Sequence, residues 1–399
     1  MCRLKSERIE RCDCDNSEAR RLRFGISLAK RIFNVFAIKP PKPNFLTPFE
    51  GRESFTVESV KEEISLLDDF NDPETMTNQR LIEQDRRLNT IGEGIEFLAL
   101  TKYDSPTDEQ LVAAENASAS DFKLGKKEAK AAHRRYKAEL VEAGKPDDEA
   151  HKEAAIRVKA ELRPESHKAL CLLLEKRNEA LRNALSDVGV EFSDPETLKV
   201  SRLSFPESVE GLKRAVPFYP QSWIDRSNKY TEVMPFKVTR SLERGHYYEN
   251  HDTHFTVAEL AIRSDDNFLV GDAMTSNATH EFAHRVGDVV PSVAYGEKTF
   301  LMRRAGHMAL QRPDGSLPQP EKLSKIDSSK TELGYRDNFP DHYMGKVYGD
   351  GELGGEIFSM GMEALFTGKY GGLSGMEGYS ADPDYRKFIL GTLASSAKK

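Results

Sequence analysis

The chain has 399 residues, of which 38% are hydrophobic and 31% are charged, and its formal net charge is −7. This length exceeds what one ordinary hydrophobic core holds, so we expect two or three domains. The mild acidity gives no general signature of nucleic-acid or membrane binding, and the chain has no run of about 18 apolar residues that could span a bilayer.

Residues 1–50 form a basic, proline-containing leader, which we expect to be partly disordered. Cys12 and Cys14 in this leader could bind a metal, but no second cysteine pair at zinc-finger spacing completes such a site. Four cysteines in all are too few for a disulfide scaffold. Since no secretory signal pattern opens the chain, we expect a reduced, cytoplasmic protein, with export by a signal-peptide-independent route as the alternative.

Residues 51–188 have the pattern of a charged, helical domain, with apolar residues at three- and four-residue spacing. Ser59 and Glu62 fit a capping box and, equally well, a solvated surface pair. One helix should end at Gly144, and another should begin at Pro164. Charges of both signs alternate along these helices, which makes nucleic-acid binding an unfavoured interpretation. A partner protein for this region is the other interpretation.

From residue 189 onward, glycine, proline and aromatic residues become more frequent. The segments TEVMPFKVTRS at 231–241 and HFTVAELAIRS at 254–264 have the β-branched and aromatic content of strands. We therefore predict an α+β protein. Its helical N-terminal region is followed by a second domain, residues 189–399, with a small mixed sheet.

The segment NATHEFAHRV at 277–286 places two histidines four residues apart. Residues at this spacing lie on one face of a helix, so His280 and His284 can direct their ring nitrogens at one Zn²⁺ ion. Glu281 is rotated about 100° from His280, which suits a general base better than a ligand. Thr275, Ser276 and Asn277 are candidate N-caps of this helix, and Gly287 is expected to end it. The alternative is two histidines that fall one turn apart by chance.

A third ligand is expected from the later segment YMGKVYGDGELGGEIFSMGMEALF at 343–366. Val290 stands where one class of zincins has its third histidine, so that class is excluded. Glu352, Glu356 and Glu363 are spaced by four and seven residues, which places them near one face of a predicted helix. Three glycines in the same stretch would suit a helix that approaches another backbone closely.

HEFAH followed by YGDGELGGEIFSMGMEALF resembles the Glu-zincin metallopeptidases, especially toxin-type members such as the catalytic domain of anthrax lethal factor. Residues 190–395 also resemble metallopeptidase-like domains of phage-derived and other mobile-element proteins. The resemblance implies a zincin-like fold, in which an active-site helix is followed by a second, ligand-bearing helix. It also implies that Glu356 is the third zinc ligand. Glu363 is the alternative ligand, or a residue that supports His280 or His284. His307 and His342 are further alternatives for the third ligand.

The family also has a tyrosine about two turns before the ligating glutamate. By position, Tyr348 would be the phenol that stabilises the oxyanion, although the family spacing is not matched residue for residue and Tyr343 is a rival. The resemblance thus implies a zinc metalloendopeptidase that acts on a protein or peptide substrate, with Glu281 as general base. We expect the strand near 254–262 to align an extended substrate by edge pairing.

Three interpretations of the function stay open. The first is a toxin, an effector, or a protease of a phage or mobile element. The second is a structural or scaffold protein of such an element, in which zinc serves folding alone and the helical half binds a partner or DNA. In the third, the helical half binds a partner or DNA, and the metallopeptidase half works only in that context. A site closed by a fourth protein ligand would favour the second interpretation.

Overall fold

A computed structural model provides the structure of the chain. The predicted leader, with Cys12 and Cys14, lies outside the residues that it describes. The described residues are 55–67, 78–124, 126–161, 165–241, 246–252, 255–263, 273–309, 321–323, 332–335, 339–348, 352–353, 355–376 and 379–398.

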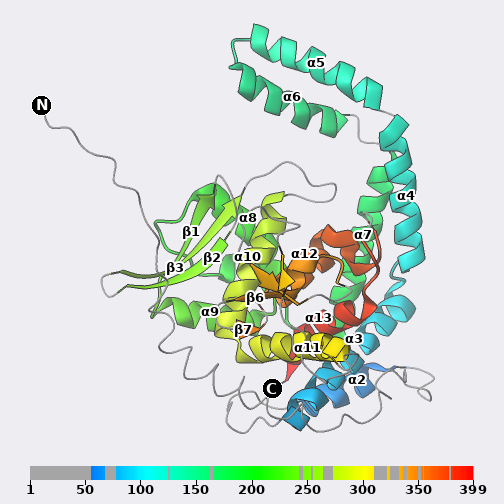
Figure 1. The fold of residues 1–399 in the computed structure, drawn as a ribbon, viewed down its shortest axis with the longest axis vertical. Helices are drawn as coiled ribbons and strands as arrows, with labels where there is room; N and C mark the ends of the chain where they lie inside the picture. Colours follow the sequence, from blue (N-terminus) through cyan, green and yellow to red (C-terminus); the bar gives the residue numbers. More distant parts are fainter. Residues whose placement is uncertain are drawn as a thin grey trace, which may run out of the picture.

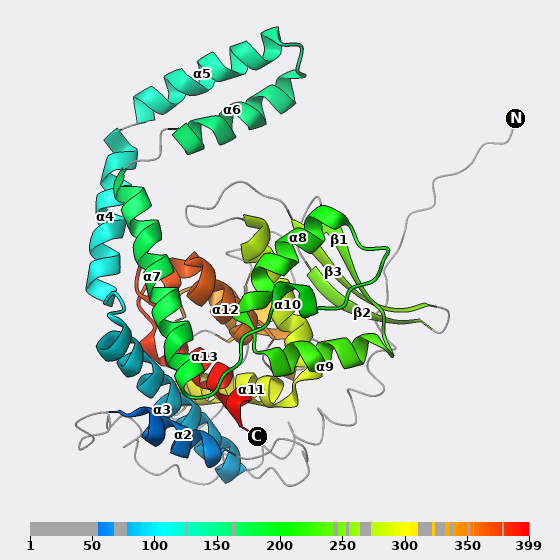
Figure 2. The same ribbon diagram turned by 180° about the vertical axis from the view of Figure 1, so that it is seen from behind.

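The described part of the first half consists mainly of helices, as the sequence predicts. α5 ends before Gly144, whose positive φ of 88° stops the helix, so this predicted end is confirmed. α5 and α6 form a hairpin at the far end of α4 and α7 and project from the body of the molecule (Figures 1 and 2). The helices are α2 (Val57–Ser65), α3 (Asn78–Tyr103), α4 (Asp108–Leu124), α5 (Lys126–Glu142), α6 (Asp147–Glu161) and α7 (Glu165–Asp187).

The first turn of α2 is capped differently from the prediction. The hydroxyl of Thr56 accepts a hydrogen bond from the Ser59 amide, and the hydroxyl of Ser59 accepts one from the Thr56 amide. The predicted box between Ser59 and Glu62 is therefore wrong. The true cap lies one turn earlier, because a serine at the third helical position can accept the return bond that glutamate usually accepts.

Both segments predicted as strands form part of one three-stranded sheet. Its strands are β1 (Phe236–Ser241), β2 (His246–Asp252) and β3 (Phe255–Arg263), in the order β1-β3-β2. β3 runs parallel to β1 and antiparallel to β2. β3 is the central strand and is paired on both sides over 258–261, so the prediction that it aligns a substrate as an edge strand is wrong.

The described remainder of the second half contains helices and a smaller antiparallel sheet, whose strands follow the order β4-β5-β6-β7. α10 contacts the first sheet and is also packed against α8, α9 and α12. The elements are η2 (Pro195–Thr197), α8 (Pro206–Ala215), η3 (Val216–Phe218), α9 (Gln221–Thr231), α10 (Ala273–Val289), α11 (Pro291–Ala309), β4 (Glu321–Lys322), β5 (Leu333–Gly334), η4 (His342–Gly345), β6 (Lys346–Tyr348), β7 (Glu352–Leu353), α12 (Ile357–Thr367), η5 (Lys369–Leu373), α13 (Pro383–Ala394) and η6 (Ser395–Ala397).

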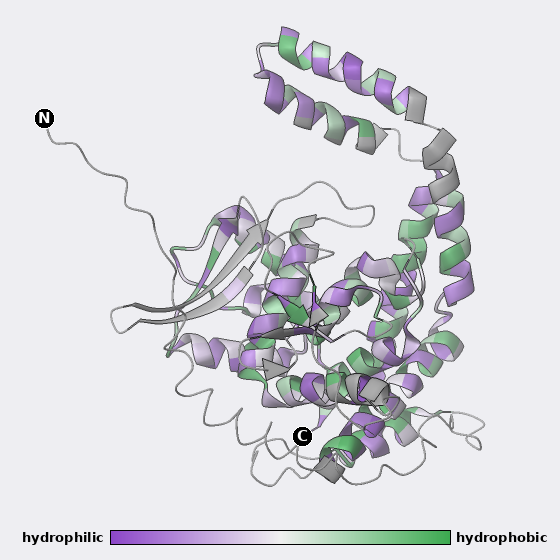
Figure 3. Cartoon of the chain, viewed as in Figure 1, coloured by the Kyte–Doolittle hydropathy of each residue, from purple (hydrophilic) through white to green (hydrophobic). Residues whose placement is uncertain are grey.

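One hydrophobic core joins the two halves of the chain. It includes Ile91 and Ile95 of α3 and Leu185 of α7 together with Phe282 of α10 and Phe388 of α13. The core therefore crosses the predicted domain boundary at 188/189, and the division into domains stays a prediction. Hydrophilic and hydrophobic residues are intermixed along the helices (Figure 3). Among the described residues, no helix has the length and apolar character needed to cross a membrane.

α3 and α13 lie unusually close together. A Cβ atom on Gly92 of α3 would lie 1.8 Å from the carbonyl oxygen of Lys387 in α13. A Cβ atom on Gly391 of α13 would lie 1.9 Å from the carbonyl oxygen of Leu88 in α3. Two glycines, one on each helix, thus allow backbone to approach backbone at this crossing.

Candidate metal centre

α10 carries the two histidines of the HEFAH motif. It runs from Ala273 to Val289, so the predicted caps and the predicted end at Gly287 lie inside the helix, and both predictions are wrong. A mid-helix glycine costs only about 1 kcal/mol relative to alanine, which packing of the helix can offset. The side chains of His280 and His284 are 13% and 18% exposed and lie on the same face.

A buried arginine fixes α10 against the neighbouring helix and sheet. Arg285 is completely buried and donates hydrogen bonds to the hydroxyl and carbonyl oxygens of Ser227 and to the hydroxyl of Thr231, all on α9. Its guanidinium also lies 4.1 Å from the ring centroid of Phe236 in β1. These contacts restrict rotation of α10 and so fix the direction of His284, the preceding residue, about 100° further around the helix.

Glu356 approaches the histidines from the start of α12. It is the N-cap residue of that helix, and only 1% of its side chain is exposed. Glu352 belongs to β7, so the prediction that Glu352, Glu356 and Glu363 share one helix is wrong for Glu352. The break comes at Gly355, whose φ of 135° cannot occur in a right-handed helix.

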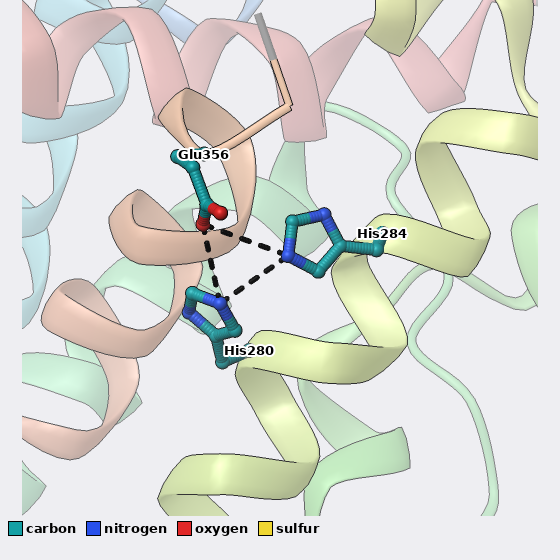
Figure 4. A group of neighbouring side chains, drawn as sticks. All are labelled: His280, His284 and Glu356. Atoms are coloured by element: carbon teal, nitrogen blue, oxygen red, sulfur yellow. Dashed lines mark hydrogen bonds and ion pairs between the residues drawn. The ribbon is translucent and has the colours of Figure 1, made fainter. Parts of the chain in front are cut away.

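Three ligand atoms converge between α10 and α12 (Figure 4). The Nε2 atoms of His280 and His284 are 3.2 Å apart. Oε2 of Glu356 lies 3.3 Å from the first of these nitrogens and 3.6 Å from the second. Tetrahedral zinc with bonds of ~2.0–2.1 Å places its ligand atoms roughly 3.3 Å from one another. The three residues therefore fit a zinc ion in both chemistry and spacing.

Glu363 lies on the other side of the His280 ring. Its Oε2 is 3.3 Å from Nδ1 of His280, whereas Nε2 faces Glu356. The other carboxylate oxygen of Glu363 accepts hydrogen bonds from Ser276 at 2.6 Å and from Lys369 at 2.8 Å. This placement favours the supporting role over the ligand role, because a carboxylate at Nδ1 orients the ring and leaves Nε2 for a metal.

The carboxylates around His280 change its proton affinity. Burial alone lowers the pKa of His280, but the charges and hydrogen bonds of Glu281, Glu356 and Glu363 outweigh that effect and raise the pKa to about 10. Burial likewise raises the pKa of Glu363, but Lys369 and His280 outweigh it, and the pKa is lowered. Without a metal, a proton on His280 therefore partly neutralises this acidic cluster.

Replacing the supporting carboxylate tests its role. We expect Glu363→Gln to weaken zinc binding by about 10- to 100-fold, because the amide holds the ring less firmly and reduces the electron density on Nε2. Competition with a chromophoric chelator measures this affinity. Glu207→Gln, an exposed position on α8, is the matched control. If the zinc affinity of Glu363→Gln equals that of the wild type, Glu363 does not support the zinc site.

Zinc binding is also expected to depend on pH. His280 must lose its proton before Nε2 can ligate, and its pKa of about 10 keeps it protonated at neutral pH. The zinc association constant should therefore rise at least about tenfold per pH unit between about pH 6 and 8. Calorimetry in buffers of different ionisation enthalpy should show at least one proton released per zinc. An affinity that does not change with pH would contradict this coupling.

Of the two candidate tyrosines, the structure describes the side chain of only one. Tyr348 lies in β6, and its side chain is outside the described part of the structure. Tyr343 lies in η4, where its hydroxyl oxygen accepts a hydrogen bond from Nζ of Lys346 at 2.7 Å. The same Nζ lies 4.0 Å from Oε1 of Glu356. Lys346 thus connects Tyr343 to the candidate site.

Two residues near the site were not predicted from the sequence. Lys346 is 7% exposed and pairs with Glu332 at 2.7 Å. Glu297 of α11 is 5% exposed, and burial raises its pKa to about 7. In the sequence, Lys346 is only a lysine shortly before the predicted ligand, and Glu297 is only a glutamate within a mostly apolar segment. Neither pattern identifies a site unless the fold is known. Glu281, 5% exposed, lies near enough to affect His280.

Comparison with known proteins finds no relative of this chain. No family model, no curated protein and no solved structure matches the chain.

Proposed function

We propose that the chain is a zinc-dependent endopeptidase of the Glu-zincin type, in which His280, His284 and Glu356 hold the ion. The observation that carries this proposal is the agreement between the three ligand-atom separations and those of tetrahedral zinc. The mixed sheet beside α10 and the later helix α12 support a zincin-like arrangement of the second half.

The residues of the site have separate tasks in this reaction. Zinc, when bound, supplies a water of lowered pKa and polarises the scissile carbonyl. Glu281 takes the proton of the attacking water and passes it to the leaving nitrogen as the carbon–nitrogen bond breaks. The hydroxyl of Tyr348, or that of its rival Tyr343, is the candidate donor to the oxyanion. Glu363 holds the ring of His280 throughout.

A zinc site that serves folding alone is the competing proposal. Such sites are closed by four protein ligands, whereas catalytic sites use three and keep one position for water. Within the described residues, the candidate cluster has three members, and Glu363 contacts the ring nitrogen that faces away from it. The donor set therefore favours the catalytic interpretation.

Metal content and proteolysis test the proposal together. We expect the purified wild type to hold one zinc ion and Glu356→Ala to lose it or bind it much more weakly, because one of three ligands is gone. Elemental analysis measures the zinc, and fluorescein-labelled casein reports cleavage of an unstructured protein. Glu207→Ala should retain wild-type values in both assays. A wild type that binds no zinc when zinc is supplied would rule the proposal out.

A further inference from the structure

The first turn of α12 requires hydrogen-bond acceptors that Glu356 does not supply. The first amides of a helix have no partner within the helix, and the N-cap side chain normally accepts from one of them. Glu356 occupies the N-cap position but makes no capping hydrogen bond, because its carboxylate is directed at the two histidines. A zinc ligand at this position leaves the helix to be capped from elsewhere.

Glu297 of α11 takes over this task. Its carboxylate accepts a hydrogen bond from the backbone amide of Phe358, and the amide of Gly355 also donates to it. These two amides flank Glu356 on either side along the chain. Glu297 therefore holds the short segment that presents the ligand, although its own carboxylate is not part of the ligand cluster.

The same carboxylate also lies against the helix that carries the histidines. A Cβ atom on Gly287 of α10 would lie 3.7 Å from Oε2 of Glu297. Glu297 is thus placed between α10 and α12, the two helices that provide the ligands. On the far side of the turn, the hydroxyl of Tyr385 in α13 donates a hydrogen bond to the carbonyl oxygen of Ile357.

We infer that Glu297 is a positioning residue, which sets the distance between Glu356 and the two histidines by capping α12 from α11. The inference rests on the proposed zinc site, and it adds a residue that contacts neither the ion nor the substrate. Loss of both amide contacts would let residues 355–358 move, and Oε2 of Glu356 would no longer be held at a ligating distance.

Zinc affinity tests this role without knowledge of the substrate. We expect Glu297→Met to weaken zinc binding by about 10- to 100-fold, since it removes both acceptors. Glu297→Gln should weaken it less, because the amide oxygen can still accept from Phe358. Chelator competition gives the affinities. The visible spectrum of the cobalt-substituted protein reports whether the coordination number changes, which a loss of stability alone would not alter.

A destabilised variant remote from the site provides the control. Leu111 of α4 is completely buried in a separate small core with Leu170, Leu174 and Met376. Leu111→Ala should lower the unfolding temperature and leave zinc affinity unchanged at low temperature. If Glu297→Met and Glu297→Gln both bind zinc as the wild type does, the positioning role is wrong while the zinc site stands. If the wild type itself binds no zinc, the proposed function is wrong, and the positioning role falls with it.

Discussion

Glu281→Gln is expected to keep its zinc ion and to lose about 10²- to 10⁴-fold in the rate of peptide hydrolysis, the range that general bases supply. Glutamine has nearly the same shape as glutamate but cannot accept the proton of the attacking water. Because Glu281 is not a member of the ligand cluster, the metal should remain. Zinc content by elemental analysis and casein cleavage under excess enzyme measure the two properties in the same preparations.

The comparison with Glu356→Ala separates chemistry from metal binding. Both variants should be inactive, but only Glu356→Ala should also lose zinc, and added zinc should not restore Glu281→Gln. Removing the Glu281 charge also lowers the pKa of His280, so zinc should bind Glu281→Gln with less competition from protons. Hydrolysis within about threefold of the wild type would show that another group takes the proton.

The local part of the site could be predicted from the sequence. His280 and His284 share a face because their four-residue spacing is fixed by helix geometry, whatever the rest of the fold does. Glu356 was predicted as the third ligand because it lies in a segment that resembles a known ligand-bearing helix. The structure places its carboxylate beside the rings of both histidines. Its role as a zinc ligand stays a prediction until metal is measured.

Other features depended on contacts between distant segments. Equal spacing suggested one helix for Glu352, Glu356 and Glu363, but spacing alone could not reveal the positive φ at Gly355 that separates Glu352 from the others. Glu297 acts on a segment about sixty residues later, so its role is invisible before α11 and α12 are docked. The central place of β3 was missed because strand order is set by non-local pairing.

Gly92→Ala is expected to destabilise the protein by roughly 2 kcal/mol. Two effects oppose each other at this position. Alanine improves helix propensity by about 1 kcal/mol, whereas overpacking in a tight core costs about 1–3 kcal/mol and occasionally more. The clash should prevail, because the new methyl group would lie 1.8 Å from a carbonyl oxygen of α13, and backbone cannot rotate away as a side chain can. Urea unfolding measures the change.

Gly296→Ala is the matched control and should change stability in the opposite direction. It also lies inside a helix, α11, but its new methyl group would meet Phe388 at 3.5 Å, an ordinary van der Waals distance. Only the propensity gain of up to about 1 kcal/mol then remains. If the two substitutions changed stability equally, backbone approach would not be what holds α3 against α13. Since α13 also carries Tyr385, which contacts the first turn of α12, a displaced α13 in Gly92→Ala should weaken zinc binding as well.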